Sequence, residues 1–115
     1  MKSTYARFLS LARLAGALPG APVLDPTEER LLQQFASFWG NDYLPRVLEA
    51  LALDGSVSRR TVQRRIDDLR TKGMIRYVAD PDDPRVKRIA PTELTERYFE
   101  RFDQLLNSAV RSTQS

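Results

Sequence analysis

Residues 58–73 of this chain read SRRTVQRRIDDLRTKG. Val62, Ile66 and Leu69 recur in this stretch at the spacing of one helix face. The serine that opens it is a good N-terminal cap, and glycine is favoured just after a helix ends. The stretch therefore predicts an amphipathic helix from about Ser58 to Lys72 whose solvent face is rich in arginine.

The next stretch, residues 74–92, reads MIRYVADPDDPRVKRIAPT. Residues 74–78 and 85–89 have the apolar and β-branched composition of strands, and the DPDDP between them is a dense turn signal. A helix followed directly by a charged two-stranded hairpin predicts a winged helix-turn-helix.

Two helices are predicted upstream of this motif. The first begins at residues 25–28, which read DPTE. The aspartate can cap the helix N-terminus, the proline fits the first helical position and the glutamate completes a capping box. Apolar residues at i, i+3, i+4 and i+7 predict a second, short helix from Leu44 to about Leu53.

The chain has 115 residues, which suits one domain with one modest core. The predicted fold class is mainly α with a small β-hairpin, as a single winged-helix domain over residues 1–115. Residues 25–90 form the central lobe. The segments 4–18 and 92–110 carry more apolar surface than such a lobe can bury alone, so we expect them to be dimerisation helices.

The composition excludes several functions. The chain has no Cys and no His, so it has no thiolate ligand, no disulfide and no histidine base. We find no nucleophile–base pair, phosphate loop or metal-ligand spacing, and expect no catalytic residue, metal or cofactor. No apolar run is long enough to span a membrane. Arg13 interrupts the one stretch that resembles a secretory signal, so we expect a cytoplasmic protein.

The positive charge is concentrated in one segment. Between Arg59 and Arg88 there are ten Lys or Arg and five Asp or Glu, whereas the rest of the chain is slightly acidic. Such a local positive field indicates a polyanionic partner. A helix of this kind fits the major groove of double-stranded DNA, where Arg can bond guanine and Gln can bond adenine. The lobe over residues 25–90 is therefore predicted to bind DNA.

The candidate DNA-contacting residues fall into two groups. On the helix they lie at the N-terminal end and on the face opposite the apolar stripe, with the flanking arginines suited to phosphates: Ser58, Arg59, Arg60, Thr61, Gln63, Arg64, Arg65 and Arg70. On the hairpin they are the cations that could reach a phosphate or a neighbouring groove: Arg85, Lys87 and Arg88.

The residues from Val57 to Thr92 resemble the MarR family of bacterial regulators. The likeness lies in the opening SRRTV and closing LRTKGMI of the helix, and in the wing DPDDPRVK. The family typically has an Asp and an Arg that brace the wing, and Asp83 and Arg85 match those positions. The chain departs from the pattern in a longer turn before the helix, in shorter terminal helices and in Pro84, which replaces an Arg.

This resemblance implies that the chain is a transcriptional regulator that acts as a repressor. It also implies that the chain binds a pseudo-palindromic operator as a homodimer. It also implies control by a small aromatic ligand in a cleft, which Phe35, Phe38, Trp39 and Tyr43 could line. The alternative that these aromatic residues form the core is favoured.

Two other functions remain open on the sequence. A winged helix can serve as a protein-interaction module, or as the DNA-binding subunit of a plasmid or phage replication or partition complex. The arginine-rich helix favours nucleic acid over protein, but the sequence does not separate transcription from replication.

Overall fold

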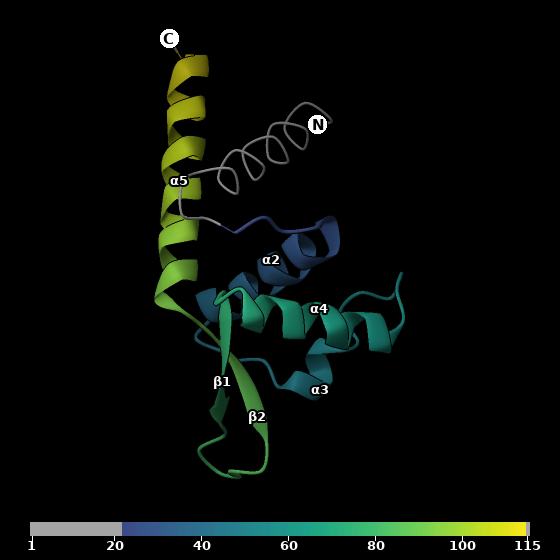
Figure 1. Cartoon of the computed structure of the whole chain (residues 1–115). Coiled ribbons are helices and arrows are strands. Elements are labelled where there is room, and N and C mark those ends of the chain that lie inside the picture. The colour runs from purple at the N-terminus through teal and green to yellow at the C-terminus, as the bar shows by residue number, and fades with distance from the viewer. Residues whose placement is uncertain (1–21, 115) are drawn as a thin grey trace. The chain divides into compact units, whose positions relative to one another are not determined.

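The computed structural model describes residues 22–114 (Figure 1). The chain is divided into two compact units. One is the lobe Leu24–Thr92, and the other contains the helix α5, Glu93–Gln114. The helix predicted over residues 4–18 lies outside the described residues.

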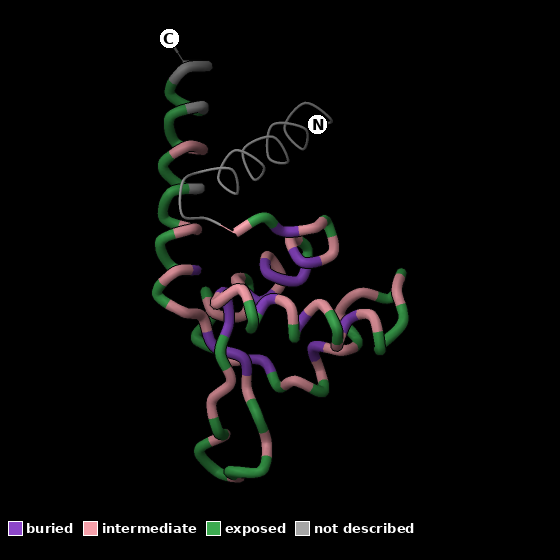
Figure 2. Tube along the Cα trace, in the orientation of Figure 1, coloured by how far each residue is buried: buried purple, intermediate pink, exposed green. Residues whose placement is uncertain are grey.

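The lobe is built from two longer helices, α2 (Pro26–Gly40) and α4 (Arg59–Thr71), which contact each other. The predicted capping box of α2 is present, since the Asp25 side chain accepts from the Glu28 backbone N–H at 2.8 Å and the Glu28 side chain accepts in return. Both helices contribute buried residues to the lobe core (Figure 2). Their fully or almost fully buried apolar residues are Leu31, Leu32, Phe35, Val62, Ile66 and Leu69, and Met74, Ile75, Ile89 and Ala90 add to the same core.

The short helix α3 spans only Val47–Ala50, so the prediction of a helix from Leu44 was wrong. Pro45 explains the difference, because a proline disfavours helical backbone in the residue before it. The segment before α3 is extended instead. The Pro45 carbonyl accepts from the Ile89 N–H at 2.8 Å. The backbones of Arg46 and Arg88 pair as an isolated antiparallel β-bridge.

The wing is an antiparallel hairpin of β1 (Ile75–Ala79) and β2 (Lys87–Pro91), with Tyr77 opposite Ile89. The second strand begins two residues later than its composition predicted. The Asp83 carbonyl accepts from the Val86 N–H at 2.9 Å, which keeps the chain in the turn up to that point. The mainly α fold with a small hairpin is confirmed.

The helix α5 covers the predicted C-terminal dimerisation segment, 92–110, from Glu93 onward and continues to Gln114. Its side chains divide into a polar face and an apolar face, and Leu105 and Leu106 on the apolar face are half-buried. Tyr98 and Phe99 contact edge to face, with 5.5 Å between ring centroids. The described part of the chain contains no helix long and apolar enough to cross a membrane.

Candidate nucleic-acid interface

The two ends of α4 are fixed by local hydrogen bonds. At the start, the Ser58 hydroxyl accepts from the Thr61 backbone N–H at 3.1 Å, as expected of an N-cap. At the end, Gly73 takes a left-handed φ of 75°, and the Met74 N–H donates to the Leu69 carbonyl at 2.9 Å. The helix predicted from Ser58 to Lys72 is therefore confirmed, together with its cap and its glycine.

The rotation of α4 about its own axis is set by contacts with α2. Val62, Ile66 and Leu69 are fully buried. The Lys72 ammonium donates to both Glu28 carboxylate oxygens, at 2.7 and 2.8 Å, and Glu28 is only 3% exposed. With one side held in this way, the opposite side of α4 must face solvent.

The solvent side of α4 contains most of the residues predicted to contact DNA. Five of them are exposed: Ser58, Arg59, Arg60, Arg64 and Arg70. Thr61 and Gln63 are partly exposed. Arg60 and Arg64 lie one helical turn apart on this side, so both guanidinium groups are available to one ligand surface.

Arg65 has a different environment from its neighbour Arg64. Its guanidinium lies 2.8 Å from an Asp25 carboxylate oxygen and 3.1 Å from one of Asp68. These ion pairs direct it toward the start of α2. We therefore assign Arg65 to the α2–α4 contact and do not carry its expected role at phosphates into our proposal.

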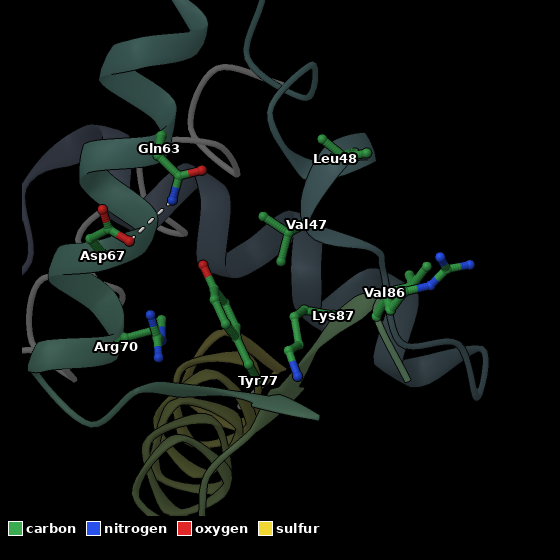
Figure 3. A pocket seen from close by; sticks show the side chains of 9 residues that line it. Val47, Leu48, Gln63, Asp67, Arg70, Tyr77, Val86 and Lys87 are labelled. Carbon is green, nitrogen blue, oxygen red and sulfur yellow. Dashed lines mark hydrogen bonds between the residues drawn. The ribbon is translucent and has the colours of Figure 1, made fainter. Parts of the chain in front are cut away.

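Gln63 is oriented by a neighbour one turn later in the helix. Its amide Nε2 donates to an Asp67 carboxylate oxygen at 3.1 Å. With the amide nitrogen held in this way, the carbonyl oxygen of Gln63 is directed away from Asp67 and can act as an acceptor (Figure 3). The exposed side of α4 therefore combines arginine donors with the acceptors of Gln63 and Asp67.

The wing carries two exposed cations. Arg85 is braced by Asp83, with 3.2 Å between Nε and Oδ1, as the family pattern implied. This side chain is nevertheless 91% exposed, so the brace orients it without burying it. Lys87, at the start of β2, is also exposed.

Arg88, in contrast, is part of the wing's internal structure. Its Nη1 donates to the Leu44 carbonyl at 2.6 Å and its Nε donates to Asp80, and the side chain is only 15% exposed. The hydrogen bond from Arg88 lowers the pKa of the Asp80 carboxyl, and the Asp82 and Asp83 backbone N–H groups contribute. The expectation that Arg88 contacts DNA is therefore revised: it ties the wing to the segment before α3.

Tyr77 was not singled out by the sequence analysis. The Arg70 guanidinium carbon lies 3.8 Å from the centroid of its ring, within the range of a cation–π contact. The strand pattern gave no signal for this pair, because only the packing of β1 beside α4 brings the two residues together.

The four aromatic residues considered as a ligand cleft contact one another instead. Phe35 is fully buried and lies 6.1 Å from Trp39 between ring centroids, and Phe38 lies 5.6 Å from Tyr43. The Trp39 indole N–H donates to the Ile89 carbonyl at 3.0 Å. These contacts favour the interpretation that the aromatic residues belong to the core and its rim.

No protein-family model matches the sequence, and no curated protein matches it. Solved structures do match. A MarR-like transcriptional regulator from Thermotoga maritima is 21% identical, with 97% of this chain and 74% of that chain covered and a TM-score of 0.70. A variant of S. aureus MepR bound to an oligodeoxyribonucleotide is 15% identical, with 97% and 77% covered and a TM-score of 0.68. The heme sensor protein PefR from Streptococcus agalactiae, in complex with heme, is 16% identical, with 98% and 73% covered and a TM-score of 0.59. The chain thus has the fold of MarR-like winged-helix regulators.

Proposed function

We propose that this chain is a sequence-specific double-stranded DNA-binding transcriptional regulator, a repressor that acts as a homodimer on a pseudo-palindromic operator. In this proposal α4 enters the major groove, and Arg60, Gln63 and Arg64 contact base edges there. Arg70 and the wing residues Arg85 and Lys87 contact the backbone. No cofactor and no catalytic step are part of it.

The observation that carries the proposal is the division of α4 into two faces. The buried stripe and the Lys72–Glu28 pair fix the helix against α2, which leaves Arg60 and Arg64 on the exposed side. A helix held in this way needs no further ordering of its backbone, which lowers the entropic cost of binding. The MepR variant with this fold was solved with an oligodeoxyribonucleotide, which supports a DNA ligand here.

The homodimer is supported by the apolar face of α5. Leu105 and Leu106 on this face are half-buried in the single chain. A two-fold axis would place two α4 helices about one DNA turn apart and would explain a pseudo-palindromic site. We expect a dimer by light scattering at micromolar concentration, and we expect Leu105→Lys to weaken it. A monomer at that concentration would refute this part of the proposal.

Selection of bound sequences from random duplex DNA with the purified chain tests the proposal as a whole. We expect enriched sites with two related half-sites separated by about one helical turn. Mapping those sites on the genome distinguishes promoters from replication or partition origins. If no sequence is enriched and binding to duplex DNA is undetectable, the alternative of a protein-interaction module is favoured.

Control by a small aromatic effector is a further part of the family expectation. PefR is described as a heme sensor, so a large planar ligand is compatible with this fold. In this chain, however, the aromatic residues proposed for a cleft contact one another. Loss of DNA binding on titration with small aromatic compounds would support an effector.

A further inference from the structure

A hollow of about 400 Å³ lies between α3, α4 and the wing, within the lobe (Figure 3). Its lining is mixed in character. Val47, Leu48 and Val86 contribute apolar side chains to its lining, and Arg70, Tyr77 and Lys87 contribute polar ones. A site with both kinds of side chain suits a ligand unit that has an apolar part and an anionic part.

The charge around the hollow is mainly positive. Arg70, Arg85 and Lys87 line it, and Asp67 is the one acidic residue among the lining side chains. Arg70 and Lys87 form no ion pair within the described part of the chain. Asp67 already accepts a hydrogen bond from Gln63, and its charge would direct an anion away from the middle of α4 toward Tyr77 and Lys87.

The Tyr77 hydroxyl is the most informative group in the hollow. It points into the space between α4 and α3 (Figure 3), yet it is buried and has no hydrogen-bond partner among the described residues. A buried polar atom without a partner is destabilising, so such atoms often mark a functional position. The Arg70 guanidinium carbon also lies 3.8 Å from the centroid of the Tyr77 ring, and this contact holds the cation at the rim of the hollow.

We propose that this hollow seats one sugar–phosphate unit of the DNA backbone, with the phosphate bound by Tyr77, Arg70 and Lys87 and the deoxyribose against Val47 and Leu48. The inference rests on the proposed function and gives it a specific backbone contact. The hydroxyl is covered in the free protein, so the exposed side chains at the rim must shift when the phosphate enters. Tyr77 then gains the partner that it lacks.

The test compares Tyr77→Phe and Lys87→Ala with the control Arg76→Ala, a cation on the same hairpin outside the hollow. On a selected duplex we expect Tyr77→Phe to weaken binding about 3- to 10-fold with an unchanged salt slope, because a neutral hydroxyl displaces no counterion. Lys87→Ala should lower the salt slope by about one unit. Arg76→Ala should leave the affinity within about 2-fold.

A methylphosphonate scan of the same duplex locates the seated phosphate. One position should weaken binding of the original chain, and Tyr77→Phe should lose most of that sensitivity. Tyr77→Phe should keep or raise Tm, because it removes an unpartnered hydroxyl. If Tyr77→Phe does lower Tm, Lys87→Ala on the methylphosphonate duplex gives the same comparison without touching that ring.

Three results would overturn the inference. In the first, no methylphosphonate position weakens binding and both hollow variants keep the original affinity, while Arg60→Ala still loses specific binding. The proposed function would then stand, but without a phosphate bound in the hollow. The second is tight binding of inorganic phosphate to the hollow together with a flat scan, since the ligand would then be a free phosphate compound. The third is no binding of any duplex by the original chain, which removes the proposed function as well.

Discussion

Arg64 and Arg65 are adjacent in the chain, and the structure gives them different environments. Arg64 is exposed on the face of α4 that we assign to bases, whereas Arg65 pairs with Asp25 at 2.8 Å and Asp68 at 3.1 Å. Replacing each by Ala removes the same charge and nearly the same atoms. The two variants are therefore matched controls for each other, and they separate recognition from folding.

The expected magnitudes follow from these environments. A bidentate contact to a base contributes about 1–3 kcal/mol of discrimination, so Arg64→Ala should lower the ratio of cognate to scrambled affinity roughly 5- to 150-fold. Its free energy of unfolding should hardly change. Arg65→Ala removes two partly exposed ion pairs of about 0.2–1 kcal/mol each, so it should lower Tm by several degrees. It should leave the affinity ratio within about 3-fold.

The assay is fluorescence anisotropy with a cognate and a scrambled duplex at one fixed salt concentration, together with thermal unfolding of both variants. Arg60→Ala should behave like Arg64→Ala. If Arg64→Ala and Arg65→Ala change the affinity ratio equally, the exposed face of α4 is not the base-reading surface. If only Arg65→Ala changes it, the assignment of the two arginines is reversed.

Three further outcomes are expected. Ile66→Ala should lower the free energy of unfolding by about 2–5 kcal/mol in urea denaturation, because Ile66 is fully buried between the helices; a smaller loss would mean that the site collapses readily. Ser58→Ala should cost about 1 kcal/mol in the same experiment by removing the cap on α4, and an unchanged midpoint would contradict the 3.1 Å hydrogen bond to Thr61. Because its folded-state pKa is lowered, Asp80 stabilises the wing above its unfolded pKa; this contribution should disappear as the pH falls below about 4, and should be absent in Asp80→Asn when thermal unfolding is followed against pH.

The sequence by itself determined the elements that local chemistry controls. Asp25 and Ser58 begin helices because their side chains can accept from backbone N–H groups three residues later, and both contacts are present. The apolar spacing of Val62, Ile66 and Leu69 determined which face of α4 is buried, and hence that Arg60 and Arg64 are exposed.

The tertiary structure decided which cations remain available to a ligand. The sequence pattern counted Arg65 on the flank of the helix, and both Lys87 and Arg88 on the hairpin, as candidate DNA contacts beside Arg64. They differ because Arg65 meets acidic side chains on α2 and its own helix, and because Arg88 meets Asp80 and the Leu44 carbonyl. Such partners are set by how segments far apart in the chain pack together.

The same reasoning applies to Tyr77 and to α3. The contact of Tyr77 with Arg70 exists only because the wing packs beside α4, and local spacing contains no trace of it. The extended segment before α3 bonds to β2 more than forty residues later, through the Pro45 carbonyl and the Ile89 N–H. Pro45 disfavours helical backbone in the residue before it, and the backbone hydrogen bond to the wing stabilises the strand-like conformation of this segment.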